Sequence, residues 1–246
     1  MAAEIHFGTE GWRGIIADDF TFENIVRVSQ AIANCIKSTN SEYQRQLISN
    51  RLLTKSPNLS VVVGYDNRFL SEKFARTATN TFLNSGFQTA ITSTSVSTPN
   101  LCYYIKGKAV GIMITASHNP PIFNGLKIKA TYGGPIPDWF AKEVERYLNK
   151  TENKSRSCMA RQLTMSEDSQ ERNTHAAAEL DIKPEYINYL KLSVDFNQIK
   201  KSKVVFDSMH GCAMHYITEL FADNSENIIQ IRNFRDSLFG FVNPEP

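Results

Sequence analysis

Cysteine is scarce in this sequence, and its spacing gives no sign of a metal site or a disulfide framework. The four cysteines lie far apart along 246 residues and form no C-x-x-C pair: Cys35, Cys102, Cys158 and Cys212. Zinc ribbons and small disulfide scaffolds both need closely spaced cysteines. We therefore expect reduced, mostly buried thiols in a cytoplasmic protein.

Long hydrophobic runs and an excess of one charge are also absent from the sequence. No apolar run approaches the ~20 residues that a membrane span needs. The first residues, M-A-A-E-I-H-F, have neither the basic start nor the apolar run of a secretory signal. Because 27 basic residues nearly balance 25 acidic ones, the formal net charge is only +2. We expect neither a membrane nor a nucleic-acid partner.

Apolar runs alternate with amphipathic segments through the first 150 residues. Ile25, Val28, Ile32 and Ile36 recur at helical spacing behind Thr21, which is typical of an N-cap. Buried strands are predicted at 60–64, 87–92, 109–115 and 126–129, and helices at 21–37, 71–86, 98–107 and 136–148. Ser71 and Thr98-Pro99 are the expected helix starts. This order predicts an α/β fold, a three-layer α/β/α domain with a mostly parallel mixed sheet.

A polar stretch divides the chain into two parts. Residues 150–175 show no sustained period, which is typical of a linker or a solvated loop. We predict a first domain over 1–150, a linker over 151–180, and an incomplete second α/β domain of the same type over 181–246. In the second part, helices are expected from Pro184 to Leu192 and over 212–221, and strands at 203–206 and 228–231.

The segment from Thr115 to Lys129, T-A-S-H-N-P-P-I-F-N-G-L-K-I-K, follows a buried strand and carries the chemistry. Sites in α/β folds lie at the carboxyl ends of strands, which is where Ser117 stands. Two prolines stiffen the loop, and Asn124-Gly125 predicts a tight turn that sends the chain back. On the returning strand Lys127 could reach toward Ser117. A nucleophile on a stiff loop beside a cation suggests phosphate chemistry.

Plainer explanations exist for each of these side chains. A lone serine more often satisfies loop backbone, and an isolated strand lysine is more often solvated. Ser117 lacks the G-x-S-x-G context of a hydrolase, and its neighbour His118 is not placed to act with it as a dyad. Both points disfavour a serine hydrolase.

Charged residues and a histidine elsewhere in the sequence are further candidates for the site. Arg13 lies among Gly8, Gly11 and Gly14, whose spacing predicts a loop that could present a guanidinium to phosphate. Asp66 and Arg68 follow a strand, so they either line the same cleft or brace its loop. Asp207 and His210, at the second strand-helix junction, are interpreted as structural or interdomain residues.

Three motifs in this order resemble the α-D-phosphohexomutase family and its phosphoglucomutase/phosphomannomutase branch: F-G-T-E-G-W-R-G, T-A-S-H-N-P-P-x-x-N-G-x-K and D-S-M-H-G. The resemblance implies an isomerase that moves a phosphoryl group between the C1 and C6 hydroxyls of a hexose through a bisphosphate. Its partners would be a hexose phosphate and a hexose bisphosphate. By the same resemblance Ser117 is the phosphoserine, Arg13 neutralises phosphate, Lys127 is the general acid/base and His118 assists the network.

The resemblance also implies Mg²⁺, held by the phosphate on Ser117 and by three aspartates of a D-G-D-x-D-R loop. That loop is absent from these 246 residues. We therefore expect a truncated chain that is inactive alone, with association possible through the incomplete second domain. The alternative is a non-catalytic remnant or a module that binds a phosphosugar or a partner. Glucose, mannose and an amino sugar stay open as substrates.

Overall fold

The computed structural model describes residues 5–8, 11–38, 60–152, 177–199, 201–221, 227–242 and 244. The extra helical turn expected within 44–53, residues 153–176 of the predicted linker, and Cys158 lie outside these described residues.

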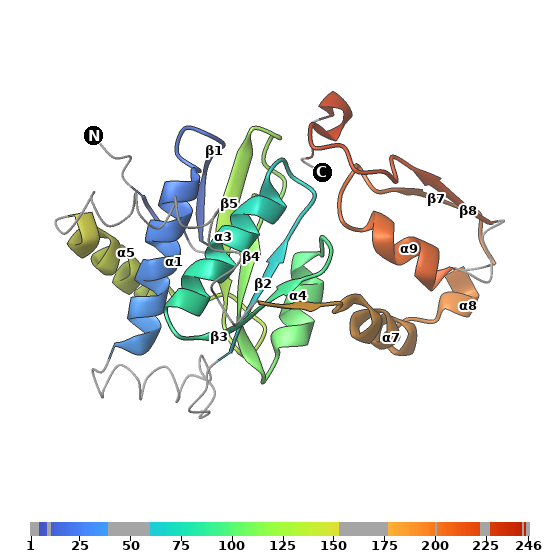
Figure 1. Ribbon diagram of the computed structural model, residues 1–246. Helices are drawn as coiled ribbons and strands as arrows, with labels where there is room; N and C mark the ends of the chain where they lie inside the picture. The colour runs from blue at the N-terminus through green and yellow to red at the C-terminus, as the bar shows by residue number, and fades with distance from the viewer. Residues whose placement is uncertain are drawn as a thin grey trace.

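A six-stranded mixed sheet forms the centre of the first part of the chain (Figure 1). Its order is β1-β5-β4-β2-β3-β6. The strands span Trp12–Ile15 (β1), Ser60–Tyr65 (β2), Gln88–Thr92 (β3), Ala109–Ile114 (β4), Phe123–Lys129 (β5) and Ala178–Leu180 (β6). Strands β4, β2, β3 and β6 are parallel, whereas β5 and β1 run antiparallel to their neighbours. The predicted mostly parallel mixed sheet is confirmed.

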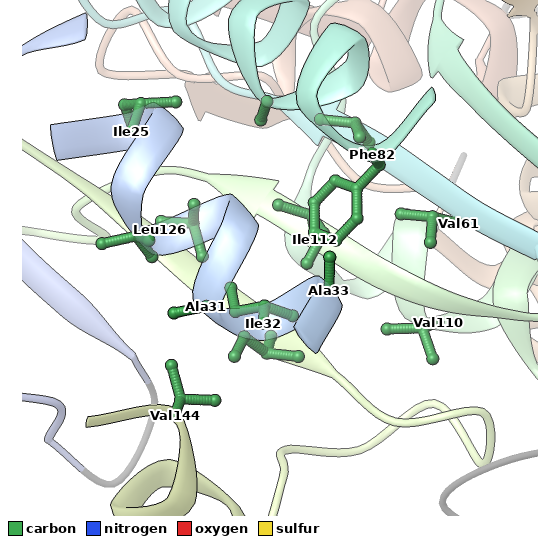
Figure 2. Close-up of a cluster of buried hydrophobic side chains, with 14 of the residues drawn as sticks. Ile25, Ala31, Ile32, Ala33, Val61, Phe82, Val110, Ile112, Leu126 and Val144 are labelled. Atoms are coloured by element: carbon green, nitrogen blue, oxygen red, sulfur yellow. The ribbon is translucent and has the colours of Figure 1, made fainter. Parts of the chain in front are cut away.

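Helices pack on both faces of the sheet and complete three layers. Helices α1 (Phe22–Lys37), α3 (Ser71–Asn84) and α5 (Asp138–Glu152) contribute to one core, and α4 (Thr98–Ile105) contributes to the other. Strand β2 shows the division, because Val61 and Val63 join the first core while Val62 joins the second. Figure 2 shows part of the first core, including Ile25, Ile32, Phe82, Ile112, Leu126 and Val144. The α/β/α layering is confirmed.

Helix starts agree with expectation at α1 and differ at the next two helices. The Thr21 hydroxyl accepts the Asn24 N–H at 3.2 Å, as a cap should. Helix α4 is capped by Ser97, one residue before the predicted Thr98. Ser71, the predicted cap of α3, is its first helical residue, and its hydroxyl donates to Asp66 Oδ1 at 2.7 Å.

Two glycine-rich segments are strands where loops or turns were expected. The predicted loop around Arg13 contains β1, which pairs with β5. The predicted turn at Asn124-Gly125 is wrong, since both residues lie inside β5. A Cβ on Gly125 would lie 2.6 Å from the Thr115 carbonyl oxygen and 2.8 Å from that of Trp12. Glycine is required there by the close approach of two backbones, not by a turn.

Chain segments beyond α5 contribute to two sheets. Strand β6 falls inside the predicted linker yet pairs in parallel with β3, a three-residue strand too short to stand out in a polar stretch. The following elements are α7 (Lys183–Ser193), α8 (Phe196–Ile199), β7 (Val204–Asp207), α9 (Met214–Leu220), β8 (Ile228–Ile231) and the 3-10 turn η3 (Phe239–Phe241). Strands β7 and β8 pair in parallel over a small core of their own. The predicted domain limits themselves stay a prediction.

The outer face of this small sheet is apolar and open to solvent. Val205, Ile229 and Ile231 are 63%, 57% and 42% exposed. In the part of the chain that the structure describes, no helix combines the length and the apolar character that a membrane crossing requires.

Candidate active site

The segment from Thr115 to Phe123, which follows β4 and includes the first residue of β5, presents Ser117 to solvent at the carboxyl end of β4. We call it the serine loop. Ser117 has a φ of 59°, which is uncommon for a residue other than glycine. Its N–H donates to Thr115 Oγ1 at 3.0 Å, and the Asn119 N–H donates to the Ala116 carbonyl at 3.1 Å. The loop is therefore a defined turn with an exposed hydroxyl, as the sequence predicts.

Beneath this loop lies the buried side chain of Arg68, which is 1% exposed. Its Nη1 donates to the carbonyl oxygens of Pro120 at 2.9 Å and Phe123 at 3.0 Å. Its Nη2 donates to those of Ser117 at 2.8 Å and Asn119 at 2.7 Å. One guanidinium thus binds four backbone carbonyls of the serine loop.

Asp66 holds that guanidinium from the side of β2. Its Oδ2 lies 3.3 Å from Arg68 Nε, while its Oδ1 accepts the backbone N–H of Arg68 at 3.0 Å. Burial lowers the pKa of Arg68, and the neighbouring Asp66 carboxylate acts in the opposite direction. Of the two interpretations of this pair, the contacts support the one in which it braces the loop.

Arg13 reaches the serine loop from the edge strand β1. Its Nη1 donates to Asn119 Oδ1 at 2.7 Å, and its side chain is exposed. The arginine and the serine are 104 positions apart in sequence (117 − 13), yet the structure brings them to one loop. This is the convergence that the sequence motifs predict.

Lys127 lies on the same face of the sheet as Arg13. Arg13 pairs with Gly125 in the antiparallel register, and side chains two residues apart on a strand share a face. The opposite face carries Leu126 and Ile128, which are fully buried in the first core. Lys127 itself is 5% exposed, so the solvated alternative is wrong. Its proposed catalytic role stays a prediction.

His118 is exposed next to Ser117. Its Nδ1 lies 3.5 Å from Ser117 Oγ, which is longer than an ordinary hydrogen bond between these atoms. The distance agrees with the expectation that the two residues are not a ready-made dyad.

Asp207, the last residue of β7, and His210, three residues later, make structural contacts. Arg232 pairs with Asp207, and this hydrogen-bonded pairing lowers the pKa of the aspartate. His210 is 2% exposed, and its carbonyl oxygen accepts from Asn67 Nδ2 at 2.9 Å. These contacts support the structural and interdomain interpretation. Among the residues that the structure describes, no group of three or more His, Cys, Asp or Glu could hold a metal ion.

The sequence did not predict that Arg68 donates hydrogen bonds to four loop carbonyls. It also did not predict that Arg13 binds the Asn119 side chain. The available signal was Y-D-N-R at the carboxyl end of β2, the same sheet edge as the serine loop. Charged side chains at neighbouring strand ends are expected to meet.

Comparison with known proteins assigns the first part of this chain. Residues 4–155 match the family model described as "Phosphoglucomutase/phosphomannomutase, alpha/beta/alpha domain I". A phosphoglucomutase of Staphylococcus haemolyticus is 29% identical over 206 residues. A Schizosaccharomyces pombe protein named "Probable phosphoribomutase" is 29% identical over 242 residues. The solved structure of a "putative phosphomannomutase" of Thermus thermophilus aligns with a TM-score of 0.76 at 31% identity.

Coverage in these comparisons is unequal. The matches take in 80% and 93% of this chain but only 37% and 38% of the two curated relatives. The solved structure covers 100% of this chain, which in turn covers 50% of the solved chain. The chain therefore spans less than half the length of these curated relatives.

Proposed function

The chain belongs to the phosphoglucomutase/phosphomannomutase family, and from that premise we propose that it takes part in moving a phosphoryl group between the C1 and C6 hydroxyls of a hexose, with Ser117 as the carrier. The observation that carries the proposal is the exposed Ser117 on a braced loop to which Arg13 is also bound. Position matters more than basicity in phosphoryl transfer, so a nucleophile on a fixed loop suits it.

In the proposed reaction, Ser117 Oγ attacks a phosphorus of a hexose 1,6-bisphosphate. The bond between that phosphorus and the sugar oxygen breaks, the hydroxyl proton of Ser117 is lost, and the departing sugar oxygen gains a proton. In the second half-reaction the phosphoserine transfers its phosphoryl group to the free hydroxyl of a hexose monophosphate that carries its phosphate at the other position, which regenerates the bisphosphate and the Ser117 hydroxyl. Lys127 would carry the proton, Arg13 would neutralise phosphate charge, and His118 would assist the network beside the serine.

The proposed substrate class is a phosphorylated hexose. Two of the relatives' names refer to hexoses, glucose and mannose, and one refers to the pentose ribose, so the names favour a hexose without singling out one sugar. Mg²⁺ belongs to the proposal through the family resemblance, with the phosphate on Ser117 as one ligand. Among the described residues, no group of three or more His, Cys, Asp or Glu could supply the remaining ligands.

Loading of Ser117 is the direct test. The full chain is incubated with glucose 1,6-bisphosphate, and its intact mass is measured before and after treatment with a phosphatase. We expect one phosphoryl group on the wild type and none on Ser117→Ala. The control Ser193→Ala, which removes a hydroxyl that donates to the Tyr189 carbonyl, should carry one phosphoryl group like the wild type. An unmodified wild type, or a modified Ser117→Ala, would contradict the proposal.

One observation favours the non-catalytic alternative, a module that binds a phosphosugar. The chain spans under half of the curated relatives' length, so a full mutase cycle does not follow from the loading step. Turnover of glucose 1-phosphate and calorimetric binding of the bisphosphate are therefore measured separately. Binding without loading of Ser117 would support the module, whereas loading supports carrier chemistry.

A further inference from the structure

Arg68 is a buried cation whose hydrogen bonds converge on the serine loop. Both Nη atoms donate to loop carbonyls, over distances of 2.7 to 3.0 Å. The side chain is 1% exposed, so it is not placed to meet a dissolved substrate. It acts on the loop backbone and not on the reacting atoms.

Only an arginine can make this set of contacts. Four carbonyls within seven residues, from Ser117 to Phe123, receive donors from a single planar group. A lysine at position 68 would offer one compact ammonium with three donors, which cannot match the spread of these oxygens. The four hydrogen bonds are partly buried, and leaving such carbonyls without a donor is costly, so the loop would lose its defined shape.

The other side of Arg68 is covered by residues 232–242, which we call the C-terminal segment. The Phe239 ring centroid lies 5.1 Å from Arg68 Cζ, and Phe239 is 6% exposed. Arg235 Nη2 donates to the Arg68 carbonyl at 3.4 Å. The neighbouring Asn67 donates to the His210 carbonyl at 2.9 Å. In Figure 1 this red segment lies beside the turn that follows β2.

Strained backbone gathers at the same place. Three residues with positive φ are close to Arg68 in sequence or contact it, Leu70 (58°), Ser117 (59°) and Phe239 (55°), and a fourth, His210 (60°), accepts a hydrogen bond from the neighbouring Asn67. Non-glycine residues keep such conformations only where the surrounding structure over-determines them. The surrounding contacts therefore fix the backbone conformation around Arg68.

We propose that Arg68 is the positioning residue of the serine loop, and that Phe239 packs against its guanidinium so that the loop's shape depends on docking of the C-terminal segment. The conformation of the serine loop then depends on a residue 122 positions after Ser117 in the sequence (239 − 117). The catalytic consequence rests on the proposed function, whereas the structural consequence does not.

Hydrogen exchange of the full chain tests the positioning role without any reaction. Arg68→Lys should speed exchange of the hydrogen-bonded loop amides of Ser117, Asn119 and Phe123 by about tenfold or more, the equivalent of one lost charged hydrogen bond. The matched control is Arg27→Lys, a 6% exposed arginine whose Nη1 donates to Asn24 on its own helix. Equal exchange in the two variants would overturn the proposal.

Two phenylalanines of η3 test the contribution of the C-terminal segment. Phe239 and Phe241 both have positive φ, of 55° and 59°, but Phe241 is 89% exposed. Phe239→Ala should speed exchange of the serine loop roughly 3- to 30-fold, as expected for a cation–π contact. Phe241→Ala should leave the loop unchanged. This pair keeps the proposal falsifiable should Arg68→Lys fail to fold, and identical behaviour of both variants would refute it.

The rate of Ser117 loading by glucose 1,6-bisphosphate provides the catalytic readout. We expect Arg68→Lys to lower the maximal rate about 100-fold, since small misplacement of a nucleophile has effects of that order, with little change in the bisphosphate concentration for half-maximal rate. Guanidinium ion should restore part of the rate in Arg68→Ala. No loading of the wild type would sink the proposed function and leave the exchange results to decide the positioning role. Unchanged loading in Arg68→Lys would overturn the inference alone.

Discussion

Replacing Gly125 by alanine tests the finding that Asn124-Gly125 lies within a strand. The added Cβ would approach the carbonyl oxygens of Thr115 and Trp12 to 2.6 and 2.8 Å. Both are backbone atoms, one in β1 and the other directly after β4, so neither can rotate away. The Gly125 carbonyl also accepts the Thr115 N–H at 2.8 Å, a bond that forms the base of the serine loop.

The expected magnitude follows from these contacts. Overpacking in a closed site costs about 1–3 kcal/mol. Distortion of the Thr115–Gly125 hydrogen bond adds about 1 kcal/mol. We expect Gly125→Ala to lower the free energy of unfolding by about 3 kcal/mol, which for a chain of this size corresponds to a fall in Tm of roughly 6–12 °C.

Thermal and urea unfolding followed by circular dichroism measure the effect. Gly8→Ala is the control, because the nearest atom to its added Cβ is the Gly11 carbonyl oxygen at 3.6 Å, an ordinary contact. It should stay within about 0.5 kcal/mol of the wild type. A Gly125→Ala variant within about 1 kcal/mol of the wild type would refute the strand assignment and return this pair to a turn.

Three further predictions concern other parts of the chain. Tyr216→Phe removes the acceptor for the Asn100 amide, bonded at 2.9 Å between the two parts of the chain. We expect a loss of about 1–3 kcal/mol in urea unfolding, and no loss would contradict the contact. Thr21→Ala should cost about 1 kcal/mol of stability by the same assay, because the Asn24 N–H loses its cap; Thr21→Ser should not. Burial raises the pKa of Cys212 to about 12, above its ordinary value of 9.0, so the folded chain holds this proton longer than the unfolded one. The resulting stability is present below about pH 9 and is lost as the pH rises toward 12, and a Cys212→Ala variant should lose Tm less steeply between pH 9 and 11 than the wild type does.

Local patterns predicted much of the fold correctly because the forces behind them are local or periodic. The apolar face of α1 and its Thr21 cap were readable from residue spacing alone. The strands at β2 and β4 were readable from runs of β-branched and apolar residues. A stretch such as Ala178–Leu180 was not, since three residues carry no period and become a strand only by pairing with β3.

Glycines misled sequence reasoning at two positions. Glycine near Arg13 suggested a loop, and Asn124-Gly125 suggested a turn, yet both segments are strands that pair with each other. The sequence shows that a position is occupied by glycine. It does not show whether glycine is needed there for its backbone conformation or because neighbouring atoms leave no room for a Cβ. The neighbouring backbone atoms, which come from distant segments, decide between the two.

The motifs by themselves identified the candidate residues, Ser117 after a buried strand with Arg13 and Lys127 as its predicted cationic partners. Such features depend on residue type and order, which a sequence states directly. Only the tertiary structure decided what holds them. Arg68 binds four carbonyls from a loop some fifty positions away and lies against Phe239 from another part of the chain. Contacts of that kind depend on how separate segments pack, and no local pattern records them.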